Sequence, residues 1–215
     1  MFRRSRNRAP ALVALAGAVL AAAGPASAMS AMVLPPLYAE PERPADQPAP
    51  PSADGCAVNV AELTDSRREP QTIGVIMAFR AIRAPQDRDA WLHSVVEVGL
   101  QARGFKTSFN AGEAPGAVNV RINVRNIWLT TQAMSKTASV VMRMSAAAPS
   151  GVAGEPHDYR GDVTGLNWAG STGEFNGLAQ RTFAEALDAM AADLRPLCAA
   201  GGGPAAAPAA PAKPS

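Results

Sequence analysis

Two short runs in the first half of the chain have the pattern of β-strands. In "CAVNVAELT", residues 56–64, Val58 and Val60 share one face, because side chains alternate between the two faces of a strand. The apolar run "IGVIMAFRAIR", residues 73–83, predicts a second strand, and Pro85 ends it. We therefore expect two strands before the first helix.

Two segments have apolar residues at the steps of three and four that are typical of helices. The first begins at Asp87 and ends at Gly104, a residue type common at helix C-termini. Its apolar stripe consists of Trp91, Val95, Val98 and Ala102. The second helix runs to Cys198, with a stripe of Phe175, Ala179, Thr182, Ala186, Met190 and Leu194.

The segment between the helices alternates more openly and predicts several strands. "FKTSF" (105–109) is followed by "AVNVRINVRNIWLTT" (117–131), whose apolar phase shifts near Asn126. The shift indicates a β-bulge or a strand that becomes covered on its second side. The run "KTASVVMRMSAAA" (136–148) predicts the return arm of a hairpin. After a Gly/Pro loop, "HDYRGDVTGLNW" (157–168) predicts a further strand.

These elements follow the order β-β-α-β-β-β-α, which predicts an α+β fold. A sheet and its helices each bury one face against the other, so we expect an antiparallel sheet of about four to six strands with two helices packed on one face. The predicted single domain covers residues 55–199.

The N-terminus has the three zones of a signal peptide. Residues 1–28 contain basic "MFRRSRNR", apolar "ALVALAGAVLAAA" and small residues at 26–28, where a signal peptidase cleaves. The apolar run is about 13 residues, shorter than the roughly 20 that cross a bilayer, so we expect cleavage, with a retained anchor as the alternative. We expect export by the general secretory route, rather than the twin-arginine route, to the periplasm or the medium. The mature protein is then not membrane-spanning.

Removal of the signal peptide changes the charge of the protein. The full chain has 20 basic and 18 acidic side chains; the signal holds four arginines and no acid, which leaves 16 basic against 18 acidic groups, about −2. The remaining chain has no Lys/Arg cluster beyond single pairs. We therefore expect no nucleic-acid binding.

Two flanks are rich in Pro, Ala and Gly. They are residues 29–54, which include "PPLYAEPERPADQPAPPSAD", and the tail 200–215. Such segments bury too little apolar surface to offset the entropy lost on ordering. We expect both to be disordered, and the first to act as a semi-stiff spacer.

The two cysteines stand at the edges of the predicted domain. An exported chain meets an oxidising compartment, so we expect Cys56 and Cys198 to form a disulfide. Zinc is the alternative, but two cysteines and two distant histidines lack the clustered spacing of a zinc site. We predict no metal and no cofactor.

The polar stretch "ELTDSRREPQTIG", residues 62–74, has two interpretations. Asp65 and Ser66 are typical of a turn, in which Arg67 pairs with Asp65 or reaches a strand-end carbonyl. Alternatively, Arg67 and Arg68 form a rim that contacts a carboxylate or a lipid phosphate. That second interpretation needs further donors, and Lys136 and Arg160 are the candidates.

No local signature supports catalysis. A base–nucleophile pair would have to bring His93 or His157 to Ser135, Ser171 or Asp162. The glycine-containing runs "GEFNG" and "GSTG" lack the Lys and the strand-to-helix context of a phosphate loop. We expect no catalytic residue.

Several short motifs resemble the YajG family of envelope lipoproteins. They are Asp65, Ser66 and Arg67, then Ile73 and Gly74, and Gly104 with Phe105 after the first helix. The resemblance covers roughly residues 56–198 and implies an envelope protein; LptE-like subunits and auxiliary lipoproteins of lipid transporters share a similar order of elements. Those relatives are tethered by a lipidated N-terminal Cys, and this sequence has none near its predicted cleavage point.

Together these observations predict a non-enzymatic periplasmic binding or assembly module of the envelope. It would act through its sheet face, an exposed strand edge or a groove between helix and sheet. An envelope protein, a lipid or a peptidoglycan component is the expected partner. A periplasmic hydrolase with an unrecognised active site is the alternative.

Overall fold

The computed structural model describes residues 31–43, 45, 52–53, 55–77, 80–166 and 170–201. The predicted signal peptide, most of residues 44–54 and the tail from 202 lie outside these ranges. In chain order the elements are β1 (Met32–Val33), β2 (Ala57–Asp65), β3 (Thr72–Ile76), β4 (Arg80–Arg83), α1 (Arg88–Gln101), β5 (Lys106–Ser108), β6 (Val118–Gln132), β7 (Ser135–Ala147), β8 (His157–Leu166) and α2 (Thr172–Gly201).

The sheet is built around the long strand β6. Strands β2 and β3 pair in parallel with the first and second halves of β6, as Val58↔Val118 and Gly74↔Leu129 show, while β7 and then β8 pair antiparallel on the other side. Beyond β2 lies β5, and beyond β3 lie β4 and then β1. The described strands therefore form one mixed sheet of eight.

The expectation of an antiparallel sheet of four to six strands was wrong. The pairings β1–β4, β2–β5, β2–β6 and β3–β6 are parallel. Strands β2 and β3 follow each other in the sequence and lie end to end along β6. They can do so because β6 has 15 residues and is long enough to pair with both. The alternation of side chains shows which face of a strand is buried, but it does not show the direction of its neighbour.

The run 73–83 is a hairpin and not one strand. Strands β3 and β4 pair antiparallel from Ile76↔Arg80 onward, and Met77 at the end of β3 has φ +50°. The turn has no Gly, Pro or Asn that would signal it in the sequence.

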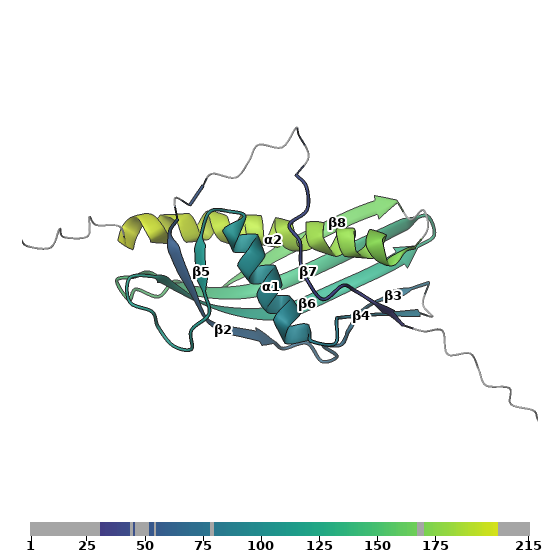
Figure 1. The fold of residues 1–215 in the computed structure, drawn as a ribbon, viewed down its shortest axis with the longest axis horizontal. Helices are drawn as coiled ribbons and strands as arrows, with labels where there is room; N and C mark the ends of the chain where they lie inside the picture. Colours follow the sequence, from purple (N-terminus) through teal and green to yellow (C-terminus); the bar gives the residue numbers. More distant parts are fainter. Residues whose placement is uncertain are drawn as a thin grey trace, which may run out of the picture.

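One face of the sheet is buried and carries both helices (Figure 1). On β6 the buried side chains are Val118, Val120, Ile122 and Val124, and then Ile127 and Leu129. The β6–β7 register shifts between Val124 and Asn126, which confirms the predicted bulge. On the other face of the sheet, every second residue of β8 is exposed, namely Asp158, Arg160, Asp162, Thr164 and Leu166.

Both helices are close to their predicted positions. The Asp87 carboxylate accepts the Ala90 N–H and caps α1, whose Trp91 packs edge-to-face on Phe183 of α2 at 5.5 Å between ring centroids. Ser171 and Glu174 form a capping box at the start of α2. Within the described residues, neither helix combines the length and the apolar composition that crossing a membrane requires.

The predicted disulfide is present. Cys56 lies just before β2 and Cys198 in the last turns of α2; their sulfurs are bonded, and their Cα atoms are 6.0 Å apart. The bond joins positions 142 residues apart in the sequence. It ties the start of β2 to the last helix.

Residues 31–43, here called the N-terminal segment, are not a disordered spacer. Met32, Leu34 and Tyr38 are buried in the core, and β1 pairs with β4. These three large apolar side chains bury enough surface to hold the segment on the domain. Residues 200 and 201, which were assigned to the tail, end α2.

The contact between β8 and α2 generates a stability prediction. A Cβ atom on Gly161 would lie 1.9 Å from the Thr182 carbonyl oxygen, so α2 rests directly on the backbone of β8. Gly161→Ala should lower the free energy of unfolding by about 3 kcal/mol, because the helix backbone must move. Gly177→Ala on α2 is the control, since its Cβ would meet no atom within 4 Å and Ala favours helix. Equal free energies of unfolding for the two variants in urea denaturation would contradict the direct contact between α2 and the backbone of β8.

Candidate functional site

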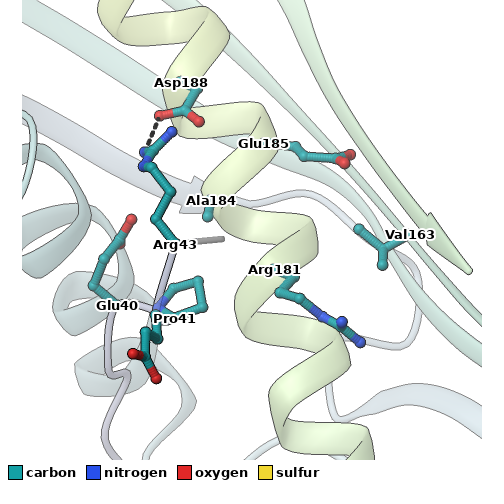
Figure 2. Close-up of a pocket in the computed structure, with 9 residues that line it drawn as sticks. Glu40, Pro41, Arg43, Val163, Arg181, Ala184, Glu185 and Asp188 are labelled. Carbon is teal, nitrogen blue, oxygen red and sulfur yellow. Dashed lines mark hydrogen bonds and ion pairs between the residues drawn. The ribbon is translucent and has the colours of Figure 1, made fainter. Parts of the chain in front are cut away.

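A cleft of about 340 Å³ lies between the N-terminal segment, α2 and β8 (Figure 2). Its described lining is Glu40, Pro41, Glu42 and Arg43 from the segment, Val163 from β8, and Arg181, Ala184, Glu185 and Asp188 from α2. Four of these side chains are carboxylates and two are guanidiniums, and the buried guanidinium of Arg103 pairs with two of the carboxylates from beneath, so the cleft keeps an excess of one negative charge. Such a surface favours a cationic group.

A buried arginine just below the cleft fixes two of its carboxylates. Arg103, which follows α1, is 1% exposed; its Nε donates to Asp188 Oδ1 at 2.8 Å, and Nη1 lies 3.1 Å from Glu40 Oε1. Nη1 and Nη2 also donate to the carbonyl oxygens of Gly99 and Ala184 at 2.6 and 2.8 Å. Because a buried guanidinium is strongly destabilising without its partners, Asp188 and Glu40 are held in place.

Tyr38 holds the second oxygen of Glu40. Its hydroxyl donates to Glu40 Oε2 at 2.9 Å, and its ring packs edge-to-face on Phe183. Burial, and then the neighbouring Glu40 carboxylate, raise the pKa of the Tyr38 phenol well above its usual range. The phenol therefore stays protonated and keeps donating at neutral pH.

Arg43 occupies the cleft from within the chain. Figure 2 shows its side chain extending from the N-terminal segment to Asp188, and Nη2 lies 3.3 Å from Oδ1 of that residue. On the other side of α2, Glu185 accepts the backbone N–H of Asp162 at 2.9 Å. The arrangement orients carboxylates toward a guanidinium and has no Ser, Cys or His in its lining. It is suited to binding.

The sequence analysis did not find this site. Glu40, Arg43, Arg103 and Asp188 carry no motif, and they come from three separated parts of the chain. One signal was present in the pattern. Gly99 is buried on α1, and Arg103 stands four residues further on the same face, where an apolar residue is the usual occupant.

The stretch 62–74 forms a tight turn around Asp65. The backbone N–H and Nε of Arg67 donate to Asp65 Oδ1 at 3.2 and 2.8 Å, and Nη2 lies 2.6 Å from Oδ2. The same Nη2 donates to the Pro70 carbonyl oxygen at 2.7 Å. Ser66 Oγ donates to Asn123 Oδ1 at 2.7 Å, whereas Arg68 is exposed. These are the contacts of the turn interpretation.

The two further donors proposed for an anion rim have other partners. Lys136 is buried and its Nζ lies 3.3 Å from Glu174 at the start of α2. Arg160 pairs with Asp162 on β8. The anion interpretation therefore rests on Arg67 and Arg68 alone, and it stays a hypothesis.

The candidate catalytic residues do not form a base–nucleophile pair. The ring of His93 packs on Phe109, and Ser135 donates to the Gln132 carbonyl oxygen. Ser135 pairs with Leu166, which is nine residues from His157 along β8, or about 30 Å at 3.3 Å per residue. Ser135 and His157 are thus at opposite ends of the sheet.

His157 has a partner that the sequence did not reveal. Its Nδ1 lies 3.5 Å from Asp193 of α2, and the hydroxyl of Tyr159 donates to the same carboxylate at 2.8 Å. Burial, and then this hydrogen bond, raise the pKa of the Tyr159 phenol. The three residues line a pocket of about 240 Å³ whose described lining has no Ser, Thr or Cys.

The Asp65 turn predicts strong coupling between two side chains. Asp65 and Arg67 side chains are 2% and 7% exposed. Asp65→Ala leaves the Arg67 guanidinium without its carboxylate, and Arg67→Ala leaves Asp65 only a longer ion pair with Arg88, whose Nε lies 3.6 Å from Asp65 Oδ2. Asp65→Ala and Arg67→Ala should each cost about 3 kcal/mol of stability, and the double variant clearly less than their sum. Arg68→Ala is the control and should change stability by less than about 0.5 kcal/mol. Additive costs, with weaker binding of anionic lipid by Arg67→Ala, would favour the anion rim instead.

The raised pKa of Tyr38 predicts a loss of stability at high pH. Above about pH 10 the unfolded chain releases the phenolic proton while the folded chain retains it, so stability falls with rising pH by up to about 1.4 kcal/mol per unit for this group. The chain has two tyrosines. Tyr38→Phe should remove a large part of the decline in melting temperature between about pH 10 and 11. An unchanged decline would show that Tyr38 ionises freely in the folded state.

Comparisons with known proteins do not show a family for this chain. No family model and no curated protein matches it. Among solved structures it is similar to protein XCC0632 from Xanthomonas campestris, described under the family model DUF330, with 10% identity, a TM-score of 0.49 and coverage of 75% of this chain and 95% of that one. It is also similar to a minor lipoprotein from Acinetobacter baumannii, with 11% identity, a TM-score of 0.36 and coverage of 63% and 94%. At these values the likeness carries no argument, and it does not identify the YajG family.

Proposed function

We propose that this chain is a non-enzymatic binding module of the cell envelope, and that the cleft beside the N-terminal segment is its binding site. The observation that carries the proposal is Arg43, a cationic side chain bound to Asp188, whose position is fixed by the buried Arg103. The ligand is a basic side chain of a partner protein, which takes the place of Arg43.

The envelope location rests on two features. Residues 1–28 have the pattern of an export signal, and the Cys56–Cys198 disulfide fits a protein that folds in an oxidising compartment. A periplasmic or secreted protein of this kind meets envelope proteins, lipids and peptidoglycan. Among these partners, the negative excess of the cleft favours a basic protein segment over an anionic lipid headgroup.

The cleft is prepared for a cation before any partner arrives. One oxygen of Glu40 accepts a hydrogen bond from Tyr38, and the other pairs with Arg103. Asp188 is also held by Arg103, which lies beneath the cleft. A preorganised site loses less entropy when it binds its ligand. Arg43 is about one third exposed and lies near the end of the described segment, so a partner's cation can replace it at small cost.

The hydrolase alternative rests on one observation, the contact between His157 and Asp193. A base of this kind would activate water or a hydroxyl group. The described lining of its pocket supplies no Ser, Thr or Cys, and the Tyr159 phenol donates to Asp193. Binding is therefore the better supported function.

A titration with a dye-labelled tri-arginine peptide, followed by fluorescence anisotropy at low salt, tests the cleft. Arg43→Ala should bind the peptide about two- to fivefold more tightly than the unmodified chain, because an exposed ion pair that competes has been removed. Binding should weaken as salt is added. Glu42→Gln combined with Glu185→Gln, in the Arg43→Ala background, should reverse the gain.

A matched control tests whether the peptide binds in the cleft or is attracted to any negatively charged part of the surface. Asp89→Asn combined with Glu97→Gln removes two exposed carboxylates from α1, outside the cleft. This pair should leave peptide affinity unchanged. If the control weakens binding as much as the cleft pair, or if Arg43→Ala gains no affinity, the cleft is not the binding site.

A further inference from the structure

Strand β8 is a long edge of the sheet. It pairs with β7 on one side, from Ser135↔Leu166 to Met144↔His157, and with no described strand on the other. The other two edge strands, β5 and β1, have three and two residues, whereas β8 has ten. Figure 1 shows β8 at the margin of the sheet, beside α2. Among the described strands, β8 is therefore the edge to which a further strand of useful length can add.

The outward side of β8 follows from one hydrogen bond. The Asp162 N–H donates to the Glu185 carboxylate at 2.9 Å and not to β7, so it points away from the sheet. In an extended strand the N–H and C=O groups of every second residue point to the same side. Arg160, Asp162 and Thr164 thus direct their backbone groups outward, whereas the residues between them bond to β7. No backbone hydrogen bond across this edge joins the described residues.

Strand β8 lacks several features by which proteins block a sheet edge. Short strands, prolines, bulges and charged side chains serve that purpose. Strand β8 has ten residues, no proline and an unbroken register with β7. Its charged side chains already have partners, because Asp158 pairs with Arg143 and Arg160 pairs with Asp162. The edge is therefore suited to main-chain pairing.

The cleft lies along this same edge. Val163 lines the cleft, and its side chain is on the face of β8 that α2 covers. A residue directly opposite Val163 on an added antiparallel strand would have its Cβ about 5 Å away, on the same face. Figure 2 shows Val163 and Glu185 on the same side of α2, where that residue would enter. A side chain of the added strand can thus extend into the cleft.

We propose that the partner binds as an extended strand, which pairs antiparallel with β8 and places a basic side chain in the cleft. The inference rests on the proposed function, because it uses the same cleft, and it adds the conformation of the ligand. Antiparallel is the expected direction because it is slightly more stable per residue. Main-chain pairing supplies affinity, and the cleft selects the basic side chain.

Two positions that this ligand needs are occupied by side chains of the chain itself. Glu185 accepts the Asp162 N–H, where a carbonyl oxygen of the added strand would accept it. Arg43 pairs with Asp188, where the basic side chain of the partner would pair. Both occupants are surface side chains that a ligand can displace at small cost. The edge and the cleft therefore show the same preference for a strand with a basic residue.

Backbone methylation of a peptide tests the pairing without a change of charge. The probe is a dye-labelled peptide of alternating Val and Thr with Arg in place of the central Val, and fluorescence anisotropy follows its binding to the unmodified exported chain. In the proposed pairing the N–H groups of the two Thr beside Arg bond to β8. Methylation of both should weaken binding by about tenfold or more, because two hydrogen bonds are lost.

The matched control carries its two methyl groups on the Val residues nearest to Arg. Their N–H groups point away from β8, as the Arg N–H does, so methylation there should change the affinity by less than about twofold. The two methylated peptides have the same composition and charge. Equal affinities of the two peptides would overturn the strand pairing.

A peptide with Gln at the centre separates this inference from the proposed function. Gln in place of Arg should weaken binding about two- to fivefold, because the ion pair in the cleft is lost. If Gln weakens binding but the two methylated peptides bind equally, the cleft still binds a cation and the strand pairing is wrong. If the methylation pattern is present but Gln has no effect, β8 pairs with the peptide and the proposed cation site is wrong. Absence of any binding contradicts both.

Amide exchange measured by NMR needs no variant of the protein. The outward N–H groups of Arg160 and Thr164 should exchange rapidly in the free chain and severalfold more slowly with saturating peptide. The N–H groups of Gly161 and Val163 bond to β7 and should be protected in both samples. Unchanged exchange at Arg160 and Thr164, in a sample with bound peptide, would overturn the proposal.

Discussion

The fold depends on covering one face of β6 along its full length. Fifteen residues of strand extend for about 50 Å, and the buried side chains on that face change phase only once, at the bulge. Helix α2 has 30 residues and spans about 45 Å, so it is matched in length to the strand that it helps to cover. The edge of β6 opposite β7 is long enough for two partners, and β2 and β3 share it.

Local patterns in the sequence predicted the elements, but not their pairing. Three features depend on neighbouring residues or on a pair with no competitor: the start of the first helix near Asp87, the bulge near Asn126 and the Cys56–Cys198 bond. Which strand lies beside β6 depends on contacts between distant residues, and alternation is the same for parallel and antiparallel neighbours. The hairpin in 73–83 was hidden because its turn residue is Met77, and the N-terminal segment was hidden because its prolines outweighed Met32, Leu34 and Tyr38 in the composition.

The candidate site was beyond the reach of motif reading for a related physical reason. Its carboxylates and guanidiniums come from the N-terminal segment, the end of α1 and the middle of α2. They form a site only in the folded chain, where the buried Arg103 brings them together. A buried cation must be satisfied from several directions, so one residue draws three segments together. The Asp65 turn, in contrast, is built from residues within five positions of each other, and its main contacts could be anticipated.

The disulfide has a consequence for the order of biogenesis. It joins Cys56, just before β2, to Cys198, near the end of the last helix, so in the proposed envelope location nearly the whole domain has to leave the export channel before the two thiols can meet. A precursor in a reducing cytoplasm lacks this link, and its unfolded chain keeps more conformational entropy. The protein therefore gains its full stability only after transport, when a threadable chain is no longer required.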